Sequence, residues 1–175
     1  MITIIAGTNR PNSRALRIAH LYASLLAQRG AAHQLLDLAA LPADFITNAL
    51  YDNVGQHPEF NQLVKLASEA DKLVFVVPEY NCSYPGVLKM FIDGLPYPGG
   101  IRGKKAALVG LGTGSQGGLL ALSHMTDILM YLGTAVLPTR VRLPFLDQHL
   151  TADGELTNAL YQQLLAEQTD QLIAF

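Results

Sequence analysis

The chain has 175 residues, of which 50% are hydrophobic and only 15% charged, and its formal net charge is -2 at pH 7. This composition excludes an intrinsically disordered chain and leaves no basic footprint for nucleic acid. No apolar stretch reaches the length of a membrane span, and the apolar run at residues 2–6 is too short for the core of a signal peptide. Cys82 is the only cysteine and cannot form an internal disulfide, so we expect a soluble protein of a reducing compartment, the cytoplasm.

Strand and helix patterns alternate along the chain without a linker or an internal repeat. Short apolar runs predict strands at residues 2–6, 33–38, 73–77 and 106–110, and the beginning of a fifth at 135–137. Helices are predicted at residues 13–29, 58–70, 86–95 and 119–132, and from Gly154 to near the end, with an irregular connection at 41–57. Five β-α units in series predict one flavodoxin-like domain over residues 1–175, an α/β three-layer sandwich with a five-stranded parallel sheet.

The segment P-E-Y-N-C-S-Y-P-G-V-L-K, residues 78–89, directly follows the apolar run at 73–77. That run lacks polar alternation, which is typical of a strand buried on both faces of a sheet. The segment therefore begins at the carboxyl end of a strand, where open α/β sheets bind ligands. Tyr80 and Tyr84 offer flat surfaces, beside backbone whose polar groups are not consumed by helix or sheet. We expect this loop to hold a planar heteroaromatic ligand; the alternative is that both tyrosines are ordinary core or interface residues.

The loop G-T-N-R-P-N-S-R, residues 7–14, joins the first predicted strand to the first predicted helix. Ser13 stands at the N-cap position, and a helix N-terminus offers unpaired N–H groups and a positive dipole end to a phosphate. Thr8 and Ser13 add hydroxyl groups, and Arg10 adds a guanidinium matched to phosphate oxygens. The loop fits neither G-x-G-x-x-G nor G-x-x-x-x-G-K-[ST], so it favours the single phosphate of a mononucleotide. The alternative is that Ser13 only caps the helix and Arg10 is solvated.

A third loop, G-L-G-T-G-S-Q-G-G at residues 110–118, follows the fourth predicted strand. Its five glycines permit a close approach to a ligand or backbone with positive φ. A flexible connection without a ligand is the alternative interpretation. Because topology brings the carboxyl ends of the first, third and fourth strands to one edge of the sheet, the three loops together favour a single shared crevice.

With these motifs the chain resembles the NADPH-dependent FMN reductase family, which includes quinone, chromate and azo-dye reductases. The resemblance is carried by residues 7–13, Leu50-Tyr51, the string at 78–89 with Phe91-Ile92-Asp93 after it, and the glycine-rich segment. It implies FMN as cofactor, with its phosphate bound by Thr8, Arg10 and Ser13. It further implies that the isoalloxazine is lined by Pro78, Glu79, Tyr80 and Asn81, with Gly114, Ser115 and Gly117 near its far side. Members of the family are usually homodimers, sometimes homotetramers, with the flavins near the subunit interface.

Three positions depart from the family pattern. The family tends to have Asn where this chain has Ala15, which removes one potential hydrogen bond to the phosphate. It has K-N-A-I-D-W where residues 89–94 read K-M-F-I-D-G, so an indole near the interface is replaced by Gly94 and partner packing should differ. The glycine-rich loop lacks the usual Ser-rich start, which shifts ring contacts onto backbone. None of these changes removes the predicted site.

No side chain stands out as a catalytic group. Five histidines and one cysteine show no metal-ligand spacing, and Cys82 has no evident base beside it, so we interpret Cys82 as a small packing residue. The resemblance suggests that the backbone of Glu79 matters more than its carboxylate. We interpret His124 as a satisfied histidine of a helix. We also expect a helix-packed symmetric dimer, with contacts from Tyr84, Phe91, Met125, Ile128, Leu129 and Tyr131.

The chemistry is then the cofactor's, and the protein binds, orients and tunes it. We predict an FMN-dependent NAD(P)H oxidoreductase that passes hydride from NADPH or NADH through bound FMN to small-molecule quinone, flavin, azo or metal-oxyanion acceptors. Two alternatives stay open. A flavodoxin-like FMN electron carrier with protein partners is usually strongly acidic, unlike this chain. A phosphoacceptor receiver domain needs acidic residues where Ala6 and Gly7 stand.

Overall fold

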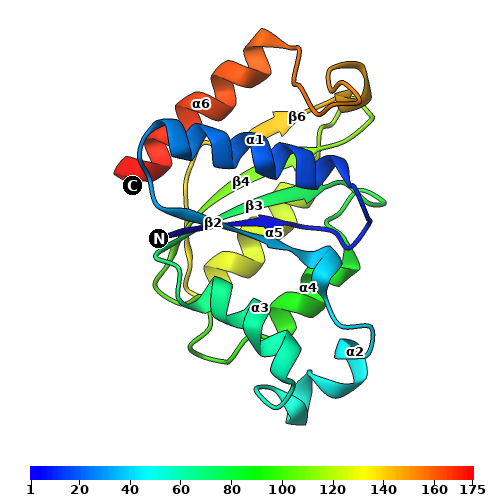
Figure 1. Ribbon diagram of the computed structural model, residues 1–175, viewed down its shortest axis with the longest axis vertical. Helices are drawn as coiled ribbons and strands as arrows, with labels where there is room; N and C mark the ends of the chain where they lie inside the picture. Colours follow the sequence, from blue (N-terminus) through cyan, green and yellow to red (C-terminus); the bar gives the residue numbers. More distant parts are fainter.

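The computed structural model covers residues 1–175 and is built around one parallel β-sheet with helices on both faces (Figure 1). The strands are β1 (Ile2–Ala6), β2 (His33–Asp37), β3 (Lys72–Pro78), β4 (Lys105–Leu111), β5 (Ala135–Val136) and β6 (Val141–Leu143). They lie in the order β2-β1-β3-β4-β5, with β6 also paired to β4, and all pairings are parallel. The predicted flavodoxin-like three-layer architecture is confirmed.

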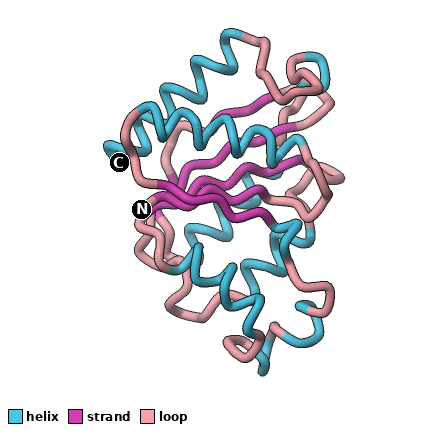
Figure 2. The backbone as a smooth tube through the Cα atoms, viewed as in Figure 1, coloured by secondary structure: helices cyan, strands magenta, loops and turns pink.

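Helices cover the sheet in two layers, which Figure 2 shows on either side of the strands. On one face lie α1 (Arg14–Gln28) and α6 (Ala159–Ala174); on the other lie α3 (Pro58–Ser68), α4 (Gly86–Asp93) and α5 (Leu119–Tyr131) (Figure 1). Successive residues of β3 point to opposite faces, so Val74 and Val76 enter the core beneath α1, whereas Phe75 and Val77 enter the core beneath α4. Both faces are buried, which explains the uninterrupted apolar run in the sequence.

The fifth strand position is shared by two short strands. β5 pairs with the start of β4 at Lys105–Ala106, and β6 pairs with its end at Val109–Leu111. Pro138 lies between them and has no N–H to donate to the ladder. The predicted strand therefore begins where expected, at Ala135, but is interrupted and resumes at Val141.

The last helix begins at Ala159, so the prediction of a start at Gly154 is wrong. Gly154 has φ 87°, a left-handed turn conformation, and its N–H donates to the carbonyl of Thr151 over 3.0 Å. The N-cap is Asn158, whose side chain accepts the N–H of Tyr161 at 3.2 Å.

No helix of the structure combines the length and apolarity that a bilayer crossing requires.

The connection 41–57 is not irregular throughout, because it contains the one-turn helix α2 (Phe45–Asn48). The ring of Phe45 stacks on Phe60 of α3 with 5.6 Å between centroids, and Phe60 meets Phe91 edge-on at 5.9 Å. Gly94 is buried beside this cluster, and a Cβ placed on it would lie 2.5 Å from Cζ of Phe60. The Phe60 ring therefore occupies the space next to Gly94, which belongs to the core and not to a partner-facing surface.

The dimer contacts predicted from the sequence are wrong for half of their members. Phe91, Met125 and Leu129 are fully buried in the core between the sheet and α3, α4 and α5. Their apolar character serves folding of the single chain. Tyr84 and Ile128 are half-buried, and Tyr131 is 81% exposed, so only these three remain available to a second copy.

Candidate functional site

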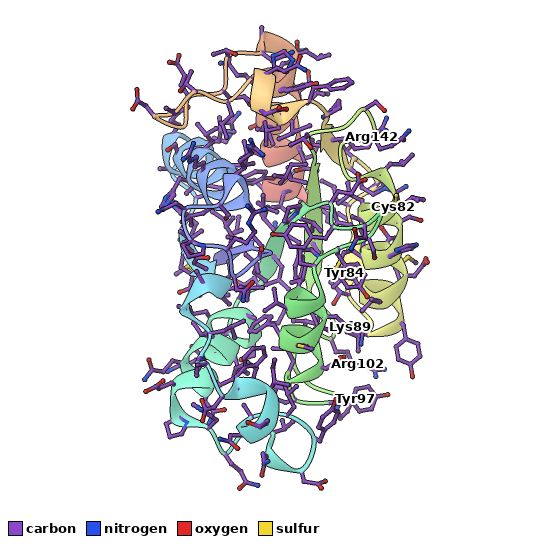
Figure 3. All side chains as sticks on the ribbon, turned by 90° about the vertical axis from the view of Figure 1, so that its right-hand side faces the viewer. Cys82, Tyr84, Lys89, Tyr97, Arg102 and Arg142 are labelled. Atoms are coloured by element: carbon purple, nitrogen blue, oxygen red, sulfur yellow. The ribbon has the colours of Figure 1, made fainter.

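A crevice of about 470 Å³ opens at the carboxyl ends of β1, β3 and β4, the edge that faces the viewer in Figure 3. Strand order reverses between β1 and β3, and open α/β sheets bind ligands at this kind of switch point. Six predicted site residues line the crevice: Thr8, Arg10, Ser13, Pro78, Glu79 and Tyr80. The other lining residues were not among the predicted site residues, although Ala15 was noted as a departure from the family pattern; they are Pro11, Asn12, Arg14, Ala15, Arg17, Leu111, Gly112, Thr113 and Leu146.

One end of the crevice is formed by the N-terminus of α1. Ser13 is its N-cap, as predicted, and its Oγ accepts the N–H of Leu16 at 3.1 Å. The N–H groups of Arg14 and Ala15, at the first two helical positions, have no carbonyl acceptor within the helix. The Ala15 side chain is buried, so only its backbone is offered to a ligand here. The arrangement is an anion site made of backbone donors and a positive helix dipole.

The same end carries three arginines, Arg10, Arg14 and Arg17, while Glu79 is the only carboxylate that lines the crevice. None of the three is in an ion pair; Arg29, far from this edge, is the only arginine that has one. The crevice therefore has an excess of positive charge although the chain as a whole is slightly negative. The spacing of Arg14 and Arg17 within a predicted helix would have placed both on one face, and this signal was available in the sequence.

The loop after β3 forms a tight hairpin turn at residues 80–83. The N–H of Tyr80 donates to the carbonyl of Ser83 at 2.8 Å, and the N–H of Ser83 donates back at 3.0 Å. Asn81 and Cys82 both have positive φ, 50° and 61°, which is the geometry of a type I′ turn. Both residues are exposed at the tip (Figure 3 labels Cys82), so Asn81 does not line the crevice.

Three side-chain hydrogen bonds tie this loop to its neighbours. The hydroxyls of Tyr80 and Thr8 are 2.8 Å apart, and Oε2 of Glu79 accepts the N–H of Gly118 at 2.9 Å. The hydroxyl of Ser83 lies 2.9 Å from Nδ1 of His124 on α5. His124 is thus a hydrogen-bonded helix histidine, as expected. Both the backbone and the side chain of Glu79 form hydrogen bonds. Its N–H donates to the carbonyl of Leu111 at 2.8 Å, and its carboxylate accepts from the glycine-rich loop.

The glycine-rich loop packs tightly at both ends and is open in the middle. A Cβ on Gly110 would lie 2.7 Å from the carbonyl oxygen of Gly117, and a Cβ on Gly117 would lie 2.6 Å from the nitrogen of Pro144. Gly114 has open space around it and is exposed, as is Ser115. The crevice is lined by Gly112 and Thr113, and not by Gly114, Ser115 or Gly117.

The arrangement suits binding of a flat anionic ligand. It contains cationic and N–H donors at one end, followed by two loops that present backbone on either side of the crevice. No three His, Cys, Asp or Glu side chains are grouped to hold a metal ion. The volume of about 470 Å³ lies within the usual range of about 300–1,000 Å³ for cofactor sites.

A family model described as NADPH-dependent FMN reductase matches residues 1–147. The chain belongs to this family. It is 34% identical over 135 residues to a 2-hydroxy-1,4-benzoquinone reductase of Burkholderia sp, covering 75% of this chain and 70% of that protein. It is 27% identical over 181 residues to an FMN-dependent NADPH-azoreductase of Staphylococcus aureus, covering 98% and 93%. The fold matches the flavoenzyme NAD(P)H:(acceptor) oxidoreductase FerB of Paracoccus denitrificans with a TM-score of 0.82 and 24% identity, covering 99% of this chain and 94% of the other.

This member of the NADPH-dependent FMN reductase family is therefore an oxidoreductase that uses FMN and NAD(P)H, as predicted. The family decides for the enzyme against the electron carrier and the receiver domain. The crevice fits the cofactor: the open N-terminus of α1 and its arginines suit a phosphate, and Gly112 lines the opposite wall without a side chain.

Proposed function

We propose that the crevice holds FMN with its phosphate at the N-terminus of α1 and its isoalloxazine between the loop after β3 and the glycine-rich loop, and that the enzyme reduces quinones. The observation that carries this proposal is the continuity of the crevice from a positively charged helix start to two backbone-lined loops. Quinones are favoured among the predicted acceptors because the relative at 34% identity is named a benzoquinone reductase. Flavin, azo and metal-oxyanion acceptors remain predictions of the same site.

The phosphate would be bound by Arg10, Ser13 and the first N–H groups of α1. The guanidinium of Arg10 has no protein partner and can form paired bonds to phosphate oxygens. Ser13 uses an oxygen lone pair for the cap and retains its hydroxyl proton for the ligand. Thr8 would donate its hydroxyl proton in the same way, with Tyr80 as the donor in their hydrogen bond.

The ring would lie against the backbone of residues 78–80 on one side and of Gly112 and Thr113 on the other. Asn81, Gly114 and Ser115 are exposed at the tips of the two loops, where they would approach the outer edge of the ring. Gly117 is buried against Pro144 and would act through the shape of the loop. Pro78 and Glu79 would form the floor, at the end of β3.

Bound FMN supplies the hydride chemistry, and the side chains of the crevice supply orientation and charge. No acid–base pair lines the crevice, which is consistent with a reaction that needs binding and alignment from the protein. NAD(P)H and the acceptor would use the same open face of the ring in turn, so we expect ping-pong kinetics.

Anaerobic reduction of the FMN-loaded protein tests the proposal. We expect NADPH or NADH to bleach the flavin absorbance within seconds and a stoichiometric amount of benzoquinone to restore it. Steady-state double-reciprocal plots with NADPH and quinone should be parallel. A protein that takes up no FMN, or intersecting plots that indicate separate sites, would contradict it.

We also propose that two copies associate through the face formed by α4 and α5. A groove of about 410 Å³ lies there, with Tyr97, 75% exposed, and Tyr131, 81% exposed, in its lining. Figure 3 shows Tyr84, Lys89 and Tyr97 along this side of the molecule. Exposed aromatic residues are enriched in interfaces between proteins. Sedimentation should show a dimer at micromolar concentration, whereas Tyr131→Glu should sediment as a monomer; a monomeric parent would contradict the assignment.

The exposed, unpaired Cys82 supports a cytoplasmic location.

A further inference from the structure

The carboxylate of Glu79 lies between the two ends of the glycine-rich loop. Its Oε2 accepts the N–H of Gly118 at 2.9 Å, and a Cβ placed on Gly112 would lie 3.6 Å from the same oxygen. Gly112 is the first residue of the glycine-rich loop's turn that lines the crevice, and Gly118 is the last residue of the loop, at the start of α5. One side chain from the loop after β3 therefore bonds to one end of the segment that forms the opposite wall and lies next to its other end.

Helix α5 has no N-terminal cap of its own. Its N-cap residue is Gly118, which has φ 83° and no side chain, and its first turn contains no acidic residue. A side-chain oxygen that accepts a hydrogen bond at a helix N-terminus satisfies an N–H that has no partner within the helix. Glu79 supplies this cap across 39 residues of sequence.

The middle of the loop has little else to hold it. Residues 113–116 are exposed, and the contacts of this stretch to the rest of the chain include a 3.2 Å bond from the N–H of Phe145 to the carbonyl of Gly114 and a 3.4 Å bond from Arg142 to the carbonyl of Gln116. Gly117 and Gly118 need positive φ, 57° and 83°, and glycine samples many other conformations when it is not restrained. The bond to Glu79 is the only side-chain bond to an N–H of this loop.

We infer that Glu79 is a positioning residue whose carboxylate caps α5 and holds the glycine-rich loop in its binding shape before FMN arrives. The inference rests on the proposed function for the identity of the ligand, but not for the contact itself. A preformed loop avoids the entropic cost of ordering it on binding, and the apparent affinity falls with the fraction of molecules in the competent shape. The role depends on the reach of the side chain and on an acceptor oxygen, and not on a proton or on the negative charge.

Three substitutions of Glu79 separate the effect of side-chain length from the effect of the negative charge. Glu79→Gln keeps the length and an acceptor oxygen but loses the charge, Glu79→Asp keeps the charge but is one methylene shorter, and Glu79→Ala loses both. Amide hydrogen exchange of Gly118, followed by NMR on the full chain both FMN-depleted and FMN-saturated, reports the cap directly. We expect Glu79→Gln to exchange like the parent, and Glu79→Asp and Glu79→Ala to exchange roughly tenfold faster or more in the FMN-depleted protein. Glu155→Ala, at an exposed glutamate away from the loop, should leave this exchange unchanged.

FMN dissociation constants of the same variants provide the second readout. They should rise for Glu79→Asp and Glu79→Ala by at least about threefold and stay near the parent value for Glu79→Gln. The inference is overturned if Gly118 exchange is unchanged in Glu79→Ala, or if Glu79→Gln is as impaired as Glu79→Ala while Glu79→Asp behaves like the parent, because charge would then be the property that matters. If the parent bound no FMN, the proposed function would fail, but the exchange measurement would still decide whether Glu79 holds the loop.

Discussion

The hydroxyl groups of Thr8 and Tyr80 lie 2.8 Å apart and join the loop after β1 to the loop after β3. Thr8 is 1% exposed, and its Oγ1 also lies 3.4 Å from the N–H of Arg10. When Tyr80 and Arg10 both donate to Thr8, the threonine proton is free to donate to a ligand in the crevice. The pair thus connects the proposed phosphate end of the site to the proposed ring end.

We therefore expect Thr8→Val and Tyr80→Phe to weaken FMN binding in a coupled way. A hydrogen bond between neutral groups contributes about 0.5–1.5 kcal/mol, so each substitution should raise Kd roughly twofold to tenfold. Thr8→Val should have the larger effect, because it removes the ligand contact and the contact to Tyr80 together. Titrations that follow FMN fluorescence measure the two single variants and the double variant that combines them. Additive effects in the double variant would show that the two hydroxyls act independently.

Arg10→Ala should loosen FMN more strongly than either of these changes. The guanidinium would make a charge-assisted bond to the phosphate, which is worth ~1.5–3 kcal/mol or roughly tenfold to a hundredfold in Kd. Arg10→Lys keeps the charge but loses the paired geometry, and we expect an intermediate value. Arg140→Ala, at an exposed arginine outside the crevice, is the matched control. An Arg10→Ala protein that binds FMN as tightly as the parent would remove Arg10 from the phosphate site.

Most of the fold follows from local patterns in the sequence. The apolar runs and the caps predict the bounds of β1, β3 and β4 and of α1, α3, α4 and α5 within one or two residues. They do so because Ser13, Gly30 and Pro58 act through their own backbone neighbours. The start of α6 was missed because its cap, Asn158, follows a hairpin closed by the bridge between Leu150 and Leu156. A pairing of that kind depends on contacts and leaves no periodic signal.

For the candidate site too, some features could be predicted from the sequence and others could not. The three loops could be predicted from topology and composition, since each follows a strand at the same edge of the sheet. The contacts that connect them could not, because Glu79 and Gly118 are 39 residues apart and Ser83 and His124 are 41 apart. Nor does the motif show that Asn81 has φ 50°, which places its side chain at the exposed tip of the turn.

Gly94→Ala should destabilise the protein through packing alone. Gly94 has φ -84°, which alanine adopts without strain, but a Cβ would lie 2.5 Å from Phe60 and 2.8 Å from Leu50. Overfilling a packed core typically costs about 1–3 kcal/mol in the free energy of unfolding. In a Phe60→Leu background the same substitution should cost less, because the ring that blocks the methyl group is gone. Urea denaturation measures this cycle, with Gly99→Ala, which meets open space, as the control. An equal cost in both backgrounds would refute the role of Phe60.

Tyr22 should determine part of the stability at alkaline pH. Its side chain is fully buried in the core that α1 and α6 form with the sheet, and its hydroxyl has no hydrogen-bond partner. Burial raises the pKa of Tyr22 well above its usual value of 10.0, and the nearby Thr169 and Arg29 offset only a part of that effect. Because the folded state disfavours the ionised form, the stability from Tyr22 is complete below the unfolded pKa of 10.0 and is lost as the pH rises from there toward the folded pKa.

We expect the free energy of unfolding to fall above pH 10 by up to about 1.4 kcal/mol per pH unit from this residue. Tyr22→Phe should remove that contribution and leave stability at pH 7 unchanged or higher, since burying an unpaired hydroxyl costs about 1–3 kcal/mol. Denaturation by urea at pH 7, 9, 10 and 11 measures both effects. Tyr51→Phe, at a tyrosine that is 81% exposed, is the control and should follow the parent curve. If Tyr22→Phe lost stability at pH 7 by more than about 1 kcal/mol, the hydroxyl would have a partner such as Thr169 and the unpaired assignment would be wrong.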